Sequence, residues 1–206
     1  RDYTTGDVIV TDEFDFIDKS DQSLIRWFER IPDVQAATPR LSATSEMNMT
    51  KNGKLIEESR IPLVGVDPFN DVRASTAHTT ISDGSYVFSR NSIVLGSTVA
   101  RDLGGAQVGD SVKVLVVDKW GQDQIRRFLV AGIASSPGGS GFDYSAVIHI
   151  DTLRDMMNRH GDTSSFMVKL HDPSAATEVK EFFLRSFPND DFIAETTEEA
   201  SEAQLE

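Results

Sequence analysis

Residues 92–133, SIVLGSTVARDLGGAQVGDSVKVLVVDKWGQDQIRRFLVAGI, carry the clearest structural pattern of the chain. They begin with three consecutive aliphatic residues at 93–95, which predict a short buried strand. Residues 97–103 follow with the composition of a short helix. Gly104 comes directly after them, where glycine commonly ends a helix because it adopts the left-handed backbone conformation without strain. This part predicts a strand followed by a helix.

The second part of the same stretch predicts a β-hairpin. Residues 111–118 alternate between apolar and polar side chains, which indicates a strand with one buried face. That face is formed by Val112, Val114 and Val116. Residues 121–123 contain a glycine and turn the chain, and residues 125–133 return as the partner strand. We expect the middle of the chain to be a compact unit rich in β-structure.

The residues before this stretch predict a strand, a helix and a second hairpin. β-Branched residues at 7–11 indicate the strand, and an apolar stripe over 22–31 indicates the helix. Residues 34–49 and 55–66 are compatible with two long strands. The dipeptide Asn52-Gly53 between them suits the positive φ angles of a tight hairpin turn.

The rest of the chain predicts alternating strands and helices. Residues 69–90 show no periodic pattern and are expected to be irregular, and the serine- and glycine-rich residues 135–141 predict a flexible loop. Asp151 is the expected cap of the helix that follows this loop. The predicted elements after the loop are strands at 146–150, 165–170 and 191–194, and helices at 151–157 and 175–187, the last with Ala176, Val179, Phe182 and Phe183 facing inward.

These patterns predict an α+β fold. Strand and helix units at both chain ends flank a β-rich middle, which favours one α+β lobe interrupted by an inserted β-rich lobe. We place the first lobe at residues 1–68 and 146–206, and the inserted lobe at residues 69–145.

The charge of the chain excludes one class of function. Its 206 residues contain 20 Lys and Arg against 33 Asp and Glu, which gives a formal net charge of −13. A nucleic-acid-binding protein needs a basic surface that displaces counterions from phosphates, and the one pair of adjacent arginines is Arg126 and Arg127. We therefore expect no nucleic-acid partner. The hydrophobic fraction of 39% is sufficient for a folded core.

Two further absences in the sequence limit the protein class. The chain has no cysteine, which excludes disulfides, thiolate metal sites and cysteine nucleophiles. No segment approaches about 18 consecutive apolar residues, the length that a membrane-spanning helix needs. The sequence begins with Arg1 instead of Met, and we expect it to be one segment of a longer protein.

No sequence motif indicates catalysis. The phosphate-binding pattern G-x-x-x-x-G-K-[ST] and the nucleophile pattern G-x-S-x-G are both missing. The four histidines stand alone, without the spacing that places two metal ligands on one helix face; they are His78, His149, His160 and His171. His149 lies within a predicted strand, and Asp143 and Asp151 flank it as a conceivable acid and base. We favour a structural histidine, and we assign no catalytic, cofactor-binding or metal-binding residue.

Several weaker candidates are also present. The glycines at 138–141 could bind an anion, but a strand and not a helix follows them, so a loop is favoured. Acidic residues at 7–21 and 190–206 indicate a solvated surface, because no calcium-loop pattern is present. Asn48-Met49-Thr50 fits the glycosylation pattern. Trp120, beside the predicted turn, is a candidate for a partner contact.

Three segments, 92–104, 108–114 and 128–133, resemble in their order the MacB-like periplasmic core domain of ABC transporter permeases. That group includes the lipoprotein-releasing and FtsX-like permeases. Two further segments agree with it, Ile31-Pro-Asp-Val-Gln-Ala36 and Leu63-Val-Gly-Val-Asp-Pro68. The motifs are mostly turn glycines and strand aliphatics, and their order along residues 5–170 carries the resemblance.

The resemblance implies an architecture and a mechanism. The lobe built from both chain ends corresponds to the porter-like lobe of the family. Such domains lie outside the cytoplasmic membrane, between the first and second spans of a permease, and contain no catalytic site or cofactor. The implied role is mechanotransmission: a cytoplasmic ABC ATPase moves two permease copies, and this domain relays the motion to an extracytoplasmic substrate or protein. The resemblance does not identify the residues that contact this partner.

Two alternatives from other classes stay open at this point. A cell-surface or secreted binding module without a transport role would have a single span or an anchor instead of about four spans. A hydrolase that uses the carboxylates around His149 would lose its activity in the variant His149→Ala while its fold stayed intact.

Overall fold

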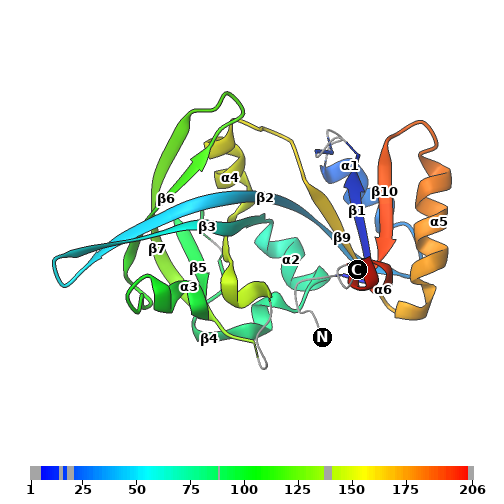
Figure 1. Cartoon of the computed structure of the whole chain (residues 1–206). Coiled ribbons are helices and arrows are strands. Elements are labelled where there is room, and N and C mark those ends of the chain that lie inside the picture. Colours follow the sequence, from blue (N-terminus) through cyan, green and yellow to red (C-terminus); the bar gives the residue numbers. More distant parts are fainter. Residues whose placement is uncertain (1–5, 14–15, 18–20, 88, 137–140, 204–206) are drawn as a thin grey trace. The chain divides into compact units, whose positions relative to one another are not determined.

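The computed structural model describes residues 6–13, 16–17, 21–87, 89–136 and 141–203, and its elements are labelled in Figure 1. Packing separates the chain into two compact units. Unit 1 comprises Arg1–Tyr3, Leu41–Pro68 and Ala77–His160, and unit 2 comprises Thr4–Arg40, Phe69–Thr76 and Gly161–Glu206. After residue 4 the chain therefore passes between the units at 40/41, 68/69, 76/77 and 160/161.

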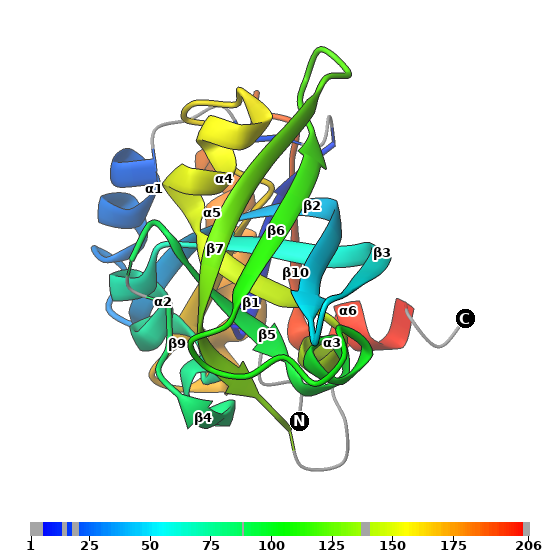
Figure 2. The same cartoon turned by 90° about the vertical axis from the view of Figure 1, so that its left-hand side faces the viewer.

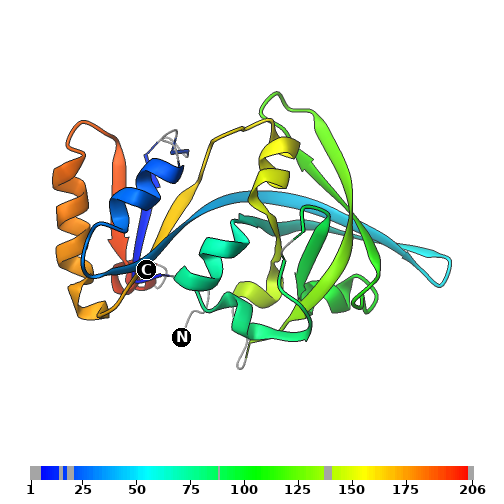
Figure 3. The same ribbon diagram turned by 180° about the vertical axis from the view of Figure 1, so that it is seen from behind.

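Unit 2 is built on an antiparallel sheet. Its strands lie in the order β10 (Phe192–Thr196), β1 (Val8–Asp12), β9 (Ser165–Leu170) and the first half of β2 (Val34–Lys51). Helices α1 (Asp21–Phe28) and α5 (Ala176–Ser186) lie beside these strands, as Figures 1 and 3 both show. The unit also contains most of α2 (Pro68–Ala74), the 3₁₀ turn η3 (Pro173–Ala175) and α6 (Thr197–Ala203).

The core of unit 2 is aromatic. Phe28 of α1, Phe166 of β9 and Phe183 of α5 are fully buried, and they share one core with alternate residues of β1. Because side chains alternate between the faces of a strand, this shared core places both helices on the same face of the sheet. Trp27 stacks on Phe182 with ring centroids 5.6 Å apart at the edge of this cluster.

Unit 1 contains strands whose pairing closes on itself. The second half of β2 pairs with β3 (Lys54–Val66), and the pairing continues through β8 (Ala146–His149), β5 (Ser92–Gly96), β7 (Asp123–Ala134) and β6 (Ser111–Val117) back to β2. The remaining elements are β4 (Ile81–Gly84), which pairs with β7, helices α3 (Ser97–Asp102) and α4 (Ile150–Met157), and the 3₁₀ turns η1 (Ala77–Thr80) and η2 (Gly141–Tyr144).

The predicted α+β class is confirmed, and the locally encoded elements agree best. Asn52 and Gly53 have φ angles of 52° and 75°, which is the positive-φ turn that their sequence favours. The alternating valines of β6 all face the core, with Val112 and Val114 fully buried. Both hairpins and the strand-helix pair of residues 92–102 are therefore present in unit 1.

Four expectations about elements were wrong. Residues 69–90 are not irregular, because they contain most of α2, η1 and β4. Helix α1 ends at Phe28, before the expected end at residue 31. Phe182 is 48% exposed, although it was expected to face inward. Asp151 lies inside α4, and the helix cap is the preceding His149.

The expected lobes, 1–68 with 146–206 and 69–145, remain a prediction. They follow from the order of the predicted strands and helices along the chain, whereas the two units are defined by packing. Residues 41–68 and 146–160 pack within unit 1. Among the described residues, none of the helices has the length and apolar character that crossing a membrane requires.

Candidate functional site

The outward face of the β6–β7 hairpin exposes a row of apolar side chains. Leu115 lies opposite Ile125 in the antiparallel register, and Val117 lies opposite Asp123. Because the even-numbered valines of β6 face inward, its odd-numbered residues face outward. The exposed fractions of Val117, Ile125 and Leu129 are 53%, 65% and 55%. Figure 2 shows the hairpin in front. Exposed apolar side chains gathered on one face of a hairpin are typical of an interaction surface.

Two cations lie opposite each other on this face. Lys113 of β6 faces Arg127 of β7 across the strand pair. Like charges placed directly opposite each other destabilise a sheet. Within the described parts of the chain, no ion pair neutralises either of them. Arg126, the neighbour of Arg127, lies opposite the inward-facing Val114, so the adjacent arginines of the sequence point to different faces.

The turn of the hairpin holds Trp120 in an exposed position. Trp120 is 66% exposed, and the ammonium of Lys119 lies 4.7 Å from the centre of its ring. Gly121 has a φ angle of 79°, a conformation that a residue with a Cβ rarely adopts. The backbone N–H of Lys119 donates to the carbonyl of Met157 at the end of α4. The turn is thus attached to a helix, and this attachment limits the conformations that Trp120 explores.

The carboxylate of Asp118 organises the same turn. One oxygen accepts hydrogen bonds from the backbone N–H groups of Trp120 and Gln122, each at 2.9 Å. The other oxygen accepts from the side-chain amides of Gln124 at 3.0 Å and Asn158 at 2.9 Å. The hydrogen bond from Gln122 is the main cause that lowers the pKa of Asp118, and burial opposes it. Asp118 therefore stays ionised and fixes the turn.

We define the hairpin surface as the outward side chains of β6 and β7 together with the turn, namely Lys113, Leu115, Val117, Trp120, Ile125, Arg127 and Leu129. It combines an exposed aromatic side chain on a fixed turn, apolar neighbours and two cations that face each other. Rigid aromatic anchors and arginine are the residues that dominate binding energy at protein interfaces. The surface fits a protein or substrate with apolar and acidic groups.

The sequence candidate His149 has a structural role. Its Nδ1 accepts the backbone N–H of Asp151 at 3.2 Å and so caps α4. Burial is the main cause that lowers the pKa of His149, and the Asp151 carboxylate opposes this shift. A neutral imidazole is the form that can accept this hydrogen bond. His149 is therefore a helix cap within a strand-helix junction.

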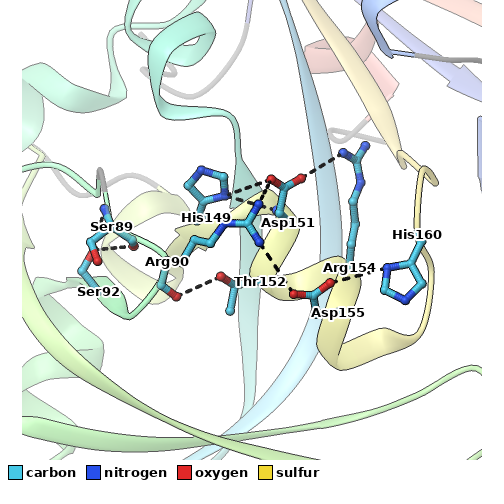
Figure 4. A network of polar contacts seen from close by, with 9 residues as sticks. All are labelled: Ser89, Arg90, Ser92, His149, Asp151, Thr152, Arg154, Asp155 and His160. Atoms are coloured by element: carbon cyan, nitrogen blue, oxygen red, sulfur yellow. Dashed lines mark hydrogen bonds and ion pairs between the residues drawn. The ribbon is translucent and has the colours of Figure 1, made fainter.

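Asp151 belongs to a network of charges on α4, which Figure 4 shows. Arg90 binds Asp151 at 2.6 Å and lies 3.8 Å from Asp155. Arg154 lies 3.6 Å from Asp151 on the same helix, and His160 lies 3.5 Å from Asp155. The hydroxyl of Thr152 donates to the carbonyl of Arg90 at 2.8 Å. The network fastens the residues before β5 onto α4.

The two carboxylates that flank His149 in sequence have separate roles. Asp143 is buried and accepts hydrogen bonds from the hydroxyl of Ser97 at 3.1 Å and from the backbone N–H of Ser136 at 3.0 Å. Asp151 binds Arg90 instead. Each carboxylate thus fastens a different loop to a helix, and this arrangement gives no support to an acid and base pair.

Two other residues singled out in the sequence, His78 and Asn48, contact neighbouring residues of the fold. His78 packs edge-on against Tyr86 with ring centroids 6.3 Å apart. Asn48 lies in β2 opposite Lys113, within the sheet. The loop candidate 138–141 lies outside the described residues except for Gly141, which begins η2. In the part of the chain that the structure describes, no group of three or more acidic or histidine side chains is arranged to hold a metal ion.

The two acidic segments meet in unit 2, and part of their charge is used in structure. Strands β1 and β10 are neighbours, which brings residues 8–12 beside residues 192–196. Asp7 accepts from the ammonium of Lys169 at 2.9 Å and from the backbone N–H of Leu170 at 2.7 Å. Asp21 accepts from the hydroxyl of Thr163 at 2.8 Å. The expectation of a solvated acidic surface therefore does not extend to Asp7 and Asp21.

Sequence reasoning singled out Trp120 but missed the rest of the hairpin surface. The signal was present in the alternation of residues 111–129, where aliphatic residues occupy both phases of the pattern. One phase supplies the core valines, and the other supplies Val117, Ile125 and Leu129. A strand that is apolar on both faces is buried on both sides or has a partner for its outer face.

Comparison with known proteins finds the same kind of transporter domain by sequence and by structure. Residues 4–182 match the family model described as the MacB-like periplasmic core domain. The periplasmic region of MacB from Actinobacillus actinomycetemcomitans has a TM-score of 0.63 and 14% identity, with 96% of this chain and 92% of that chain covered. The extracellular domain of the noncanonic ABC-type transporter YknZ from Gram-positive bacteria has a TM-score of 0.58 and 12% identity, with 92% and 99% covered.

A third solved structure has the same architecture. A domain of a putative permease protein from Porphyromonas gingivalis has a TM-score of 0.53 and 15% identity, with 94% of this chain and 90% of that chain covered. At these identities the likeness concerns the fold. A search among curated proteins found no significant match.

Proposed function

Because the chain belongs to the MacB-like periplasmic core domain family, we propose that it relays ATP-driven motion from the cytoplasm to a substrate or protein outside the membrane. It is the extracytoplasmic domain of a MacB-like ABC transporter permease. The family is a transporter domain and not an enzyme class. Its members work with an ATPase component. The proposed role is mechanical, and the domain catalyses no reaction of its own.

The proposal includes three partners. An ABC ATPase subunit or domain acts through the membrane-spanning part of the permease, and a second permease copy forms the moving pair. The third partner is an extracytoplasmic substrate or protein. It binds at the hairpin surface, and the observation that supports this is the opposed cations Lys113 and Arg127 among exposed apolar side chains. A partner with carboxylates next to apolar groups would relieve the repulsion between the two cations.

The relay is tested on the complete permease with its ATPase. One spin label on each of two permease copies, introduced at the exposed Arg101 of α3, reports the distance between the two domains. We expect this distance to differ between the ATP-bound state and the ADP-bound state. An identical distance in both states, in a permease with measurable ATPase activity, would count against the relay.

The partner contact is tested by crosslinking in cells that express the complete permease. A photoreactive residue at Ile125 is compared with one at Arg101, which is also exposed but lies on α3. We expect a discrete adduct from position 125, and its loss when Lys113→Glu and Arg127→Glu are combined. Equal adducts from positions 125 and 101, or an adduct that survives the charge reversal, would show that the hairpin surface is not the partner site.

A further inference from the structure

Arg40 and Asp71 form a buried ion pair within unit 2. The guanidinium Nε and Nη2 of Arg40 donate to the same carboxylate oxygen of Asp71, at 3.0 and 2.8 Å. Arg40 is 6% exposed and Asp71 is fully buried. The two residues are 31 positions apart in the sequence. An ion pair removed from water in this way holds its geometry closely, because the loss of either contact leaves a buried charge without its partner.

The same two residues bind further parts of unit 2. The hydroxyl of Ser75 donates to the second carboxylate oxygen of Asp71 at 2.9 Å, and the backbone N–H of Ser75 donates to the carbonyl of Asp71 at 2.8 Å. The carbonyl of Arg40 accepts the backbone N–H of Ser164 at 2.8 Å. We call Arg40, Asp71, Ser75 and Ser164, joined by these hydrogen bonds, the Arg40 node.

The position of the node along the chain is its distinctive feature. Arg40 is the last residue of unit 2 before the chain passes into unit 1 at 40/41. Asp71 and Ser75 belong to the segment Phe69–Thr76, which enters unit 2 at 68/69 and leaves it at 76/77. Ser164 follows the return of the chain at 160/161 by a few residues. One node therefore joins the unit-2 side of all four passages.

We propose that the Arg40 node makes the four passages between the units move as one body. A domain that relays motion must transmit the displacement of one unit to the other. Four connecting segments that bend independently of one another would absorb that displacement. A shared buried ion pair with backbone and hydroxyl hydrogen bonds removes this freedom. The inference rests on the proposed relay, and it deepens it by identifying the residues that transmit the motion.

The test measures the spread of distances between the two units in the 206-residue chain. The sequence has no cysteine, so the double variant Arg101→Cys and Glu178→Cys places one spin label on α3 of unit 1 and one on α5 of unit 2. The distance distribution is then recorded with and without Arg40→Met. We expect Arg40→Met to broaden the distribution clearly. An unchanged width in a folded Arg40→Met protein would overturn the proposal.

The matched control is Arg73→Met on α2, the helix that carries Asp71. Arg73 is 53% exposed and lies 3.4 Å from Glu29, so this variant removes an exposed ion pair of unit 2 and leaves the node intact. We expect the width in Arg73→Met to equal that of the parent. Equal broadening in both variants would overturn the proposal, because it would attribute the effect to the loss of any arginine that pairs with a carboxylate in unit 2.

A second variant covers the case in which Arg40→Met does not fold. Ser75→Ala removes one hydroxyl hydrogen bond to Asp71 and keeps both charges. We expect a smaller broadening in a folded Ser75→Ala protein, and an unchanged width would overturn the proposal. The measurement needs neither membrane nor ATPase. Failure of the nucleotide-dependent distance change in the complete permease would therefore count against the relay, whereas failure here counts against the node.

Discussion

The imidazole of His149 makes the stability of unit 1 depend on pH. Burial holds its pKa below the ordinary value of 6.5. The charged groups that act on it are Asp151 and Arg154 on α4, Arg90 before β5, and Asp67 directly after β3. As pH falls below about 6.5, the unfolded chain binds a proton at this residue more readily than the folded chain does. The free energy of unfolding therefore decreases until the pH passes the lower folded pKa, and then stays level.

Urea unfolding at several pH values between 7.5 and 5 measures this dependence. We expect wild type to lose stability relative to His149→Asn as the pH falls, because asparagine can cap the helix and does not titrate. The control His160→Gln changes a histidine that is 70% exposed in its side chain, and it should retain the wild-type decrease. Parallel pH profiles of wild type and His149→Asn would contradict the prediction.

Arg60 occupies an unfavourable backbone conformation. Its φ angle is 58° in the middle of β3, whereas the other described non-glycine residues with positive φ are Asn52 and Asn158. Asparagine tolerates this region better than arginine does. We expect Arg60→Asn to raise the free energy of unfolding by about 0.5–1 kcal/mol. The control Arg60→Ala keeps a Cβ and removes the guanidinium, so a gain of the same size in Arg60→Ala would show that the charge and not the backbone is responsible.

Residue roles were only partly accessible from the sequence. The sequence predicted His149 inside a strand and Asp151 as the cap of the following helix, whereas His149 is the cap, because the strand ends earlier than its residues indicate. The exposed Trp120 was predicted because its turn is encoded locally by Gly121. The partners of Asp118 include Asn158, 40 positions away, and no local pattern indicates such a contact.

At the scale of elements, α5 offers a direct comparison between two neighbouring aromatic residues. Phe183 is fully buried among Phe28, Phe187 and Phe192, and Phe182 is 48% exposed and stacks on Trp27. We expect Phe183→Ala to lower the free energy of unfolding of unit 2 by about 3–5 kcal/mol. Phe182→Ala should cost about 0.5–1.5 kcal/mol, the value of an aromatic pair.

Guanidinium chloride unfolding followed by the fluorescence of Trp27 measures both changes, in a Trp120→Phe background so that unit 2 alone is reported. The two variants remove the same atoms from adjacent positions, so each is the control for the other. Similar losses in both would mean that Phe182 is as well packed as Phe183, in conflict with its exposure.

Elements with local determinants were predicted well, and those that depend on distant partners were not. The hairpin at Asn52 and Gly53 and the alternating strand β6 are specified by their own residues. Helix α2 is only seven residues long and is fixed by the contact between Asp71 and Arg40, 31 positions earlier. Short helices gain their stability from tertiary packing, so the pattern of residues 69–90 alone did not indicate one.

The net charge is distributed very unevenly over the whole molecule. Unit 1 contains 12 Lys and Arg against 13 Asp and Glu, a net charge of −1, and unit 2 contains 8 against 20, a net charge of −12. The sequence gives the net charge of −13 for the whole chain. It does not show how this charge is divided between the two units, because the boundaries of the units depend on long-range strand pairing. Strand β2 alone pairs with β9 in its first half and with β6 in its second.

Self-repulsion within unit 2 leads to a prediction about ionic strength. The Debye length falls from about 30 Å at 0.01 M salt to about 8 Å at 0.15 M, so added NaCl screens the repulsion among the carboxylates of unit 2. We expect backbone amides of β1, β9 and β10 to exchange more slowly at 0.15 M NaCl than at 0.01 M. Those of β6 and β7, in a unit with almost balanced charge, should change little.

Hydrogen exchange measured by mass spectrometry compares both units in the same sample, so unit 1 is the internal control for any general effect of salt. Replacing the carboxylates Glu178 and Glu181 on α5 by glutamine lowers the negative charge of unit 2 by two without touching its core, because both residues are exposed. This variant should show a smaller salt effect than wild type in β1, β9 and β10. Equal slowing in the strands of both units, or an unchanged salt effect in the glutamine variant, would mean that the excess charge of unit 2 does not weaken its fold.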